Sequence, residues 1–460
     1  MAADDGSRVL RIIGLLRQTM ARSLPEKRLP SIRGMARAQR VSPSTVVEAY
    51  GRLVAEGAVV ARPGAGFYAT GRQRPLALKQ VEPNRDRAID PHWIMRQSLE
   101  MPPSALRPGC GWLPDDWLPQ GLLRAALRAQ ARDAAANVTA YATPLGHVPL
   151  RRLLAQRLAD QAIEAAPDAI LLTDSGSAAI DLICRFLLRP GDTVMIDDPG
   201  YFNFQAMLRA QRVNVIGVPT TPVGPDLAAF AMLAAEHRPK LYLTTSALHN
   251  PTGATLSTAT AHRLLKLAET HDMIVVEDDI FADFEPALSP RLAAMDGFER
   301  VIHLGSFSKT LSAASRCGYI AAKPEWIEGL TDLKLATGFG HHDLSSQLVT
   351  RILGEAGFRR HIETLRARLA AERDRVVGRL RHLGLTPWLV PRAGMLVWLE
   401  LPDGLDSATL AMRALAEDVV LAPGNVFSVS QAAGRFLRFN VAQCGDPRLF
   451  DVLARLIRSA

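Results

Sequence analysis

The sequence has few cysteines and no long apolar run. Its 460 residues include four cysteines, which form no Cys-x-x-Cys pair and have no histidine at ligand spacing. A disulfide framework and a metal site are therefore not indicated. No apolar run approaches the roughly 18–20 residues that a membrane-spanning helix needs, and two acids stand where a signal peptide would be basic. We expect a cytoplasmic globular protein that keeps its cysteines reduced. These cysteines are Cys110, Cys184, Cys317 and Cys444.

Acidic residues are scarce in the first 74 residues. That stretch has thirteen lysines and arginines against five acids, which leaves a net charge of +8. The formal charge of the whole chain is also +8, so the remainder balances to zero. A charge excess confined to a small N-terminal module points to a polyanion, most simply nucleic acid. A solvated basic face is the alternative.

The sequence of the N-terminal module predicts three helices and a hairpin. Ser31 caps a short second helix, residues 42–54 form a third with Ser42 or Ser44 as its cap, and residues 58–69 read as a hairpin with a glycine-rich tip. The expected core stripe of the first helix is Val9, Ile12, Ile13, Leu16 and Met20. The expected inward positions of the second and third helices are Ile32, Met35, Ala36, Val46, Val47, Tyr50 and Leu53.

This order of elements indicates a winged helix-turn-helix whose third helix reads the major groove of DNA. A purely structural three-helix domain remains the alternative. The candidate DNA contacts are Arg28, Arg33, Ser42, Ser44, Thr45 and Arg62. The run RLPSIRGMARAQRVSPSTVVEAYGRLVAEGAVVARPGAGFYA resembles the GntR-type winged helix. It departs from that pattern at Met35, where leucine is usual, and at Pro43, where many members have an arginine that contacts DNA.

A change of composition separates this module from the rest of the chain. We expect a winged helix over residues 1–71, a linker over 72–104, and a large region over 105–460. The linker is rich in proline and poor in apolar residues, although Ile89, Trp93 and Met95 suggest that its second half packs on something.

The large region alternates apolar β-branched runs with helical stretches. Such a pattern predicts an α/β domain with a mainly parallel sheet that is covered on both faces. We expect this large domain over about 140–345, and a smaller α+β domain over about 346–460 together with the N-terminal arm. The predicted strands are Ala169–Leu172, Thr193–Asp197, Val213–Val218, Lys240–Thr244, Met273–Glu277, Val301–Leu304 and Gly318–Ala322.

Polar side chains follow five of these strands. Active sites of such sheets lie at the carboxyl ends of the strands, so these groups are expected to meet. Lys309 is the most informative, because a lysine near other cations and away from water becomes a nucleophilic amine. Such an amine can form a Schiff base with a pyridoxal cofactor, and nearby hydroxyls and an arginine can hold the cofactor's phosphate. Each group taken alone also has an ordinary structural interpretation, such as a turn or a helix cap.

Together these groups resemble the fold-type I pyridoxal-phosphate aminotransferases of class I/II, over roughly residues 105–460. The resemblance implies that Lys309 carries the cofactor, Asp278 faces the pyridine nitrogen, Asn250 binds the ring 3-hydroxyl and Tyr201 stacks on the ring. It also implies a phosphate site, and a dimer in which Tyr141 reaches the neighbouring subunit's phosphate. Arg438 matches the arginine that pairs with a substrate carboxylate. The implied phosphate ligands are Gly176, Ser177, Ala178, Ser306, Ser308 and Arg316.

One departure bears on activity. Family members carry a tyrosine two or three residues after the position of Asp278, where this chain has Ile280 and Phe281. Loss of that phenol argues against rapid transamination.

The complete chain resembles the MocR (PdxR-like) subfamily of bacterial regulators. This resemblance implies a homodimeric, domain-crossed transcriptional regulator that binds promoter DNA and senses pyridoxal 5'-phosphate or an amino compound. A working aminotransferase with an auxiliary DNA-binding domain is the alternative. A dimerisation module that has lost its cofactor is a third possibility.

Overall fold

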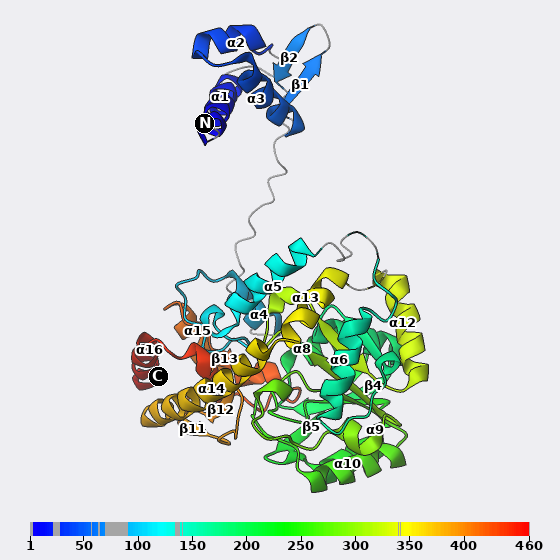
Figure 1. Ribbon diagram of the computed structural model, residues 1–460. Helices are drawn as coiled ribbons and strands as arrows, with labels where there is room; N and C mark the ends of the chain where they lie inside the picture. Colours follow the sequence, from blue (N-terminus) through cyan, green and yellow to red (C-terminus); the bar gives the residue numbers. More distant parts are fainter. Residues whose placement is uncertain are drawn as a thin grey trace. The chain divides into compact units, whose positions relative to one another are not determined.

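The structure is a computed structural model that describes residues 3–21, 28–56, 58–62, 65–69, 91–133, 139, 141–338, 340 and 342–459. The chain divides into two compact units, Met1–Arg87 and Ala88–Ala460, which are drawn in Figure 1 and described separately below. Among the described helices, none is both long enough and apolar enough to span a membrane. Residues 63–64 at the tip of the predicted hairpin and residues 72–90 of the predicted linker lie outside the described residues.

The first unit is a three-helix domain with a hairpin. Its helices enclose one apolar core, to which α1 and α3 contribute most of the side chains. Ser31 and Ser42 cap α2 and α3 as their sequence positions predict, since each side chain accepts a backbone N–H from the first turn. The elements are α1 (Ala3–Ala21), α2 (Ile32–Gln39), α3 (Pro43–Ala55), β1 (Val59–Arg62) and β2 (Gly66–Ala69).

One residue of α3 was assigned to the wrong face. Val47 was expected to point inward, but it is 51% exposed, and Ala49 occupies the core instead. The inward row of α3 is therefore Val46, Ala49, Tyr50 and Leu53, which follows the i, i+3, i+4, i+7 spacing of one helix face.

Tyr50 attaches the hairpin to the helices. Its ring stacks on Phe67 of β2 with centroids 4.1 Å apart, and its hydroxyl donates to the Pro30 carbonyl at 2.6 Å. Burial raises the pKa of Tyr50 to about 12, so this donor stays protonated at neutral pH. The tyrosine therefore joins α3, the loop before α2 and the hairpin.

The second unit is built around an eight-stranded sheet with the order β3-β10-β9-β8-β7-β4-β5-β6. The strands from β9 to β5 are parallel, whereas β10 runs antiparallel to both of its neighbours. The strands are β3 (Ile170–Thr173), β4 (Thr193–Asp198), β5 (Asn214–Thr221), β6 (Gly224–Pro225), β7 (Leu241–Thr244), β8 (Ile274–Asp278), β9 (Val301–Ser306) and β10 (Gly318–Ala321).

Helices cover both faces of this sheet, which explains why its strands are apolar at consecutive positions. In β3, Leu171 packs with one set of helices, while Ile170 and Leu172 pack with the other. The first set is α7 (Gly176–Leu187), α8 (Phe202–Ala210) and α12 (Pro324–Gly338). The second set is α6 (Val148–Ala159), α9 (Leu227–His237), α10 (Thr258–Thr270), α11 (Leu292–Asp296) and α13 (Asp343–Leu353). Helices α9 and α10 lie side by side (Figure 1).

The smaller domain packs helices on a four-stranded antiparallel sheet with the order β11-β12-β14-β13. Its elements are α14 (Ala356–His382), β11 (Thr386–Pro387), β12 (Leu396–Glu400), α15 (Ser407–Leu415), β13 (Ala422–Pro423), β14 (Phe436–Asn440) and α16 (Arg448–Arg458). Two further helices, α4 (Pro91–Glu100) and α5 (Gln120–Arg132), precede the large sheet in the chain. Trp93 and Ile94 of α4 are buried in the core of the smaller domain.

Candidate functional site

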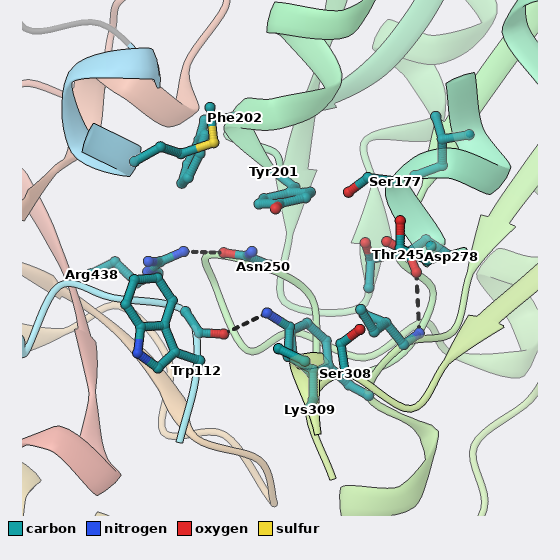
Figure 2. Close-up of a pocket in the computed structure, with 18 of the residues that line it drawn as sticks. Trp112, Ser177, Tyr201, Phe202, Thr245, Asn250, Asp278, Ser308, Lys309 and Arg438 are labelled. Carbon is teal, nitrogen blue, oxygen red and sulfur yellow. Dashed lines mark hydrogen bonds between the residues drawn. The ribbon is translucent and has the colours of Figure 1, made fainter. Parts of the chain in front are cut away.

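A cavity of about 250 Å³ gathers most of the predicted site residues. Side chains from the ends of the parallel strands meet there with residues of the smaller domain and with residues between Met95 and Trp112, which precede the large sheet in the chain. Figure 2 shows Ser177, Thr245 and Asp278 on one side, Arg438 and Trp112 on the other, and Lys309 and Asn250 between them. The lining residues are Met95, Leu99, Gly111, Trp112, Ser175, Gly176, Ser177, Ile180, Tyr201, Phe202, Thr245, Asn250, Asp278, Ile280, Phe281, Ser308, Lys309, Ala313, Arg316 and Arg438.

Lys309 follows β9 and projects its amine into the cavity. Its Nζ donates to the Gly111 carbonyl at 2.7 Å. Burial, and then the nearby Arg438 guanidinium, lower the pKa of Lys309 to about 8. The lowered pKa increases the neutral fraction of this amine near physiological pH, and the neutral amine is the nucleophilic form.

Asp278 ends β8 and presents a buried carboxyl group. Its Oδ1 accepts the Ile280 N–H at 3.1 Å. Burial raises the pKa of Asp278 to about 7, and the adjacent Asp279 carboxylate contributes to that rise. A cation placed against this carboxyl would reverse the shift, because an opposite charge favours the ionised form.

A buried ion-pair network holds the chain directly behind Asp278. Arg291 donates to Asp279 at 2.8 Å and to Glu285 at 2.5 Å, and all three side chains are almost completely buried. Glu277 accepts the backbone N–H groups of Leu292 and Ala293. The network therefore fixes the segment that leads from β8 into the cavity.

Arg438 reaches the cavity from β14 and is 1% exposed. Its Nη1 donates to Asn250 Oδ1 at 2.9 Å and its Nη2 to the Gly109 carbonyl at 2.5 Å, while Nε has no hydrogen-bond partner among the described residues. Burial lowers the pKa of Arg438 to about 10, so the group remains cationic at neutral pH. Such a buried cation suits a carboxylate.

The predicted phosphate ligands divide into two groups. Gly176, Ser177, Ser308 and Arg316 line the cavity, and they are joined by Ser175, the residue that caps α7. Ser306 lies behind Ser308, with the two Oγ atoms 2.9 Å apart.

Ala178 differs from the prediction. It is absent from the cavity lining, and its backbone N–H donates to Ser175 Oγ at 3.0 Å as part of the helix cap. The side chain of the N-cap residue Ser175 therefore satisfies the N–H of Ala178. The first-turn N–H groups that remain for a ligand are those that precede Ala178.

Tyr201 and Tyr141 have different surroundings. Tyr201 lines the cavity and packs edge-on against Phe204, and burial followed by the nearby Asp278 carboxylate raises the pKa of Tyr201 to about 12. Tyr141 does not line the cavity, and it is 82% exposed. Its predicted role in a neighbouring subunit stays a prediction.

Several lining residues were not predicted from the sequence. Thr245 directly follows β7, so its position at the end of a predicted strand, like that of Asn250, could have indicated it. Trp112 lies in the glycine-rich Gly109–Trp112 stretch, and Met95 and Leu99 fall in the predicted linker. No spacing in the sequence connects those three residues to Lys309.

In the first unit, most of the candidate DNA contacts lie at the surface. Arg28, Arg33, Ser42, Ser44 and Arg62 are exposed. The Arg62 guanidinium lies 4.6 Å from the centroid of the Tyr68 ring on the paired strand. This contact orients the Arg62 side chain on the hairpin.

The prediction that Thr45 contacts DNA is wrong. It is 5% exposed, and its hydroxyl contacts Ser42 Oγ at 2.7 Å. Its side chain therefore stabilises the start of α3, and the structure does not present it to DNA. Exposed Val47 is a surface residue of the same helix that the sequence analysis placed inside.

The donor set of the cavity fits pyridoxal 5'-phosphate. It combines a nucleophilic amine at Lys309, a carboxyl group at Asp278 and an amide at Asn250 with an anion site at the start of α7. Ile280 and Phe281 also line the cavity, so apolar side chains stand where the family tyrosine was expected. Fold and site together define an aminotransferase-like domain of fold type I.

Family comparisons agree with this class. Residues 113–456 match the model for aminotransferase class I and II, and residues 10–69 match that for bacterial regulatory proteins of the gntR family. The chain belongs to the aminotransferase class I and II family. It joins that domain to a GntR-type helix-turn-helix domain, which is the fused, MocR-like architecture.

Individual proteins resemble all or part of the chain. The HTH-type transcriptional regulator YdcR of Escherichia coli (strain K12) is 29% identical over 438 residues, which cover 93% of each chain. The 2-aminoadipate transaminase of Thermus thermophilus is 30% identical over 329 residues, covering 69% of this chain and 81% of that protein.

The solved structures resemble the aminotransferase part. LysN, the α-aminoadipate aminotransferase of Thermus thermophilus, was solved with N-(5'-phosphopyridoxyl)-L-leucine. It superposes with a TM-score of 0.72 at 27% identity, covering 79% of this chain and 94% of its own. Pyrococcus horikoshii kynurenine aminotransferase gives a TM-score of 0.74 at 25% identity, with 81% and 95% of the chains covered.

Proposed function

We propose that this protein is a cytoplasmic transcriptional regulator that binds promoter DNA through residues 1–71. Its aminotransferase-like domain, residues 105–460, binds pyridoxal 5'-phosphate at Lys309 and senses the cofactor or an amino compound. The observation that carries the proposal is a GntR-type module and a lysine-centred cavity in one chain. YdcR, which matches nearly the whole chain, is named as an HTH-type transcriptional regulator, and LysN was solved with a phosphopyridoxyl amino acid.

In this proposal, different residues of the cavity bind different parts of the cofactor. Lys309 supplies the amine for covalent attachment, and Tyr201 lies against the ring. Asp278 stays ionised next to the pyridine nitrogen and keeps a proton on that atom. Bound pyridoxal phosphate supplies an electrophilic carbon that reacts with primary amines and an electron-withdrawing ring.

The phosphate and the amino compound take opposite sides of the cavity. The first-turn amides of α7 that precede Ala178, with Ser177, Ser308 and Arg316, bind the phosphate dianion, because a helix N-terminus favours negative charge. Arg438 binds the carboxylate of the amino compound. That carboxylate would compete with the Asn250 and Gly109 oxygens that now accept the Arg438 hydrogen bonds.

We place the protein in a homodimer in which Tyr141 contacts the phosphate of the neighbouring subunit. A dimer would also present two winged helices to two half-sites of DNA, as is usual for helix-turn-helix proteins. Ligand binding then changes DNA affinity through differential binding to two arrangements of the domains.

An aminotransferase with an auxiliary DNA-binding domain is the alternative, and the similarity to 2-aminoadipate transaminase favours it. The two functions differ in turnover. With Ile280 and Phe281 in place of a phenol donor, we expect transfer of an amino group to a 2-oxo acid far below the roughly 1–10 per second of ordinary enzymes. The measurement is formation of the new amino acid by the cofactor-loaded protein across a panel of amino donors. Sustained turnover in the ordinary range would favour the enzyme.

A further inference from the structure

The cavity contains a second, apolar surface that the cofactor site does not explain. Met95 and Leu99 of α4 line the cavity together with Trp112 and Phe202. Leu99 is 75% exposed, so most of its side-chain surface is in contact with solvent. Figure 2 places Phe202 and Trp112 on the Arg438 side, away from Ser177 and Asp278. This apolar surface therefore lies where the proposed function places the amino compound.

The charges around the cavity limit what the amino compound can be. The charged lining residues are Asp278, Lys309, Arg316 and Arg438. The proposed function uses Asp278, Lys309 and Arg316 for the cofactor and Arg438 for one carboxylate. The other lining residues on the Arg438 side are apolar, and they include Met95, Leu99, Trp112 and Phe202. An apolar side chain gains favourable free energy by burial against such a surface, so this surface favours an uncharged, apolar ligand side chain.

Helix α4 is anchored on one side and free to meet a ligand on the other. Ile94 and Ser98, one turn apart, are each 2% exposed, and α4 packs against α8, which begins at Phe202. Met95 and Leu99 form the neighbouring row at the same i, i+4 spacing. A ligand that covers Leu99 would bury apolar surface that is now in water, which is favourable.

The same helix adjoins the connection to the DNA-binding module. In the chain, α4 begins at Pro91, shortly after the boundary between the two units at Arg87 and Ala88. Its C-terminal end is held by Arg107, which donates to the carbonyls of Ser98 at 3.0 Å and Met101 at 2.7 Å. The chain then continues to Gly109 and Gly111, whose carbonyls accept from Arg438 and Lys309. Residues 91–111 thus run without interruption from the interdomain connection to the cofactor lysine.

We propose that the sensed compound is an amino acid with an uncharged apolar side chain, and that α4 recognises this side chain through Met95 and Leu99. Binding covers Met95 and Leu99 and so restrains α4, which lies shortly after the boundary between the two units in the chain. This inference rests on the proposed function, since it assigns the ligand of the same site.

The test uses the full-length, cofactor-loaded protein titrated with L-leucine, L-phenylalanine, L-alanine, L-aspartate and L-lysine, followed by the visible absorption of the bound cofactor. We expect L-leucine and L-phenylalanine to bind at least about tenfold more tightly than L-aspartate and L-lysine. In Leu99→Ala and Met95→Ala, the affinity for L-leucine should fall about tenfold, since each lost CH₂ contact removes a share of apolar burial. The affinity for L-alanine, whose side chain is a single methyl group with little apolar surface to bury, should change by less than about twofold.

Leu127→Ala is the matched control, because Leu127 is an exposed leucine of α5 that does not line the cavity. Hydrogen exchange over residues 91–101 gives a second readout, and L-leucine should slow it more than L-alanine does. Equal binding of charged and apolar amino acids would overturn the inference. So would an equal loss for L-leucine and L-alanine in Leu99→Ala, which indicates a merely structural role. If the protein loads with cofactor but responds to no amino acid, the inference fails while sensing of the cofactor itself stands. If the protein fails to load with cofactor, the proposed function fails.

Discussion

Lys309→Ala is expected to abolish the visible absorption band that the protein shows with pyridoxal 5'-phosphate. The substitution removes the amine that attaches the cofactor, whose pKa of about 8 makes it reactive near neutral pH. The phosphate site at α7 is intact in this variant, so some non-covalent binding of the cofactor is expected to persist. That binding does not restore the band, because the band requires covalent attachment to the Lys309 amine. The measurement is the absorption spectrum after dialysis against excess cofactor and then buffer.

Lys266→Ala is the control for this substitution. Lys266 is an exposed lysine of α10 that does not line the cavity, so its variant should keep the full band. Measured without cofactor, both variants should unfold cooperatively, with midpoints within about 4 °C of the cofactor-free unmodified protein, since bound cofactor would itself stabilise the folded state. A normal band in Lys309→Ala would refute Lys309 as the attachment site.

Removal of residues 1–74 is expected to abolish DNA binding and leave the cofactor spectrum unchanged. This segment carries the whole formal charge excess of the chain, and phosphate neutralisation by basic residues supplies most of the affinity of such modules. The measurement is a titration of the DNA fragment that adjoins the protein's own gene, with spectra recorded on the same samples. DNA binding by the shortened protein would refute the domain assignment.

Point variants separate the DNA-contacting surface from the rest of that module. Arg33→Ala and Arg62→Ala should each weaken binding across DNA sequences and lower the slope of log affinity against log salt by about 1, as expected for one lost phosphate contact. Arg128→Ala, an exposed arginine of α5 in the other unit, changes the net charge by the same amount and should leave the slope unchanged.

The strands and the strand-end residues could be predicted from the sequence because a doubly covered parallel sheet is apolar throughout. The run Val301–Leu304 became β9, Val301–Ser306, and Met273–Glu277 became β8, Ile274–Asp278. Since parallel strands end at the same edge, knowing the strands was enough to bring Asn250, Asp278 and Lys309 to one cavity.

The remaining features depend on contacts between distant parts of the chain. Met95 and Leu99 line a cavity that also contains Lys309, more than 200 residues away in the sequence. The apolar residues of α4 predict that the helix is packed, but they do not identify the part of the protein on which it packs. The pairing of Arg438 with Asn250 follows from the docking of β14 beside the large sheet. Within α3, Val46 and Val47 look alike to a periodicity argument, and the packing of α1 on α3 decides which is buried.

The most direct test of the proposed regulator is its DNA affinity in defined ligand states. The same promoter fragment is titrated with cofactor-free protein, cofactor-loaded protein, loaded protein with L-leucine, and Lys309→Ala treated identically. We predict that loading or L-leucine changes the affinity by roughly 5- to 150-fold, the usual range of allosteric coupling, and that Lys309→Ala shows no such change. Equal DNA affinity in every state would contradict the account.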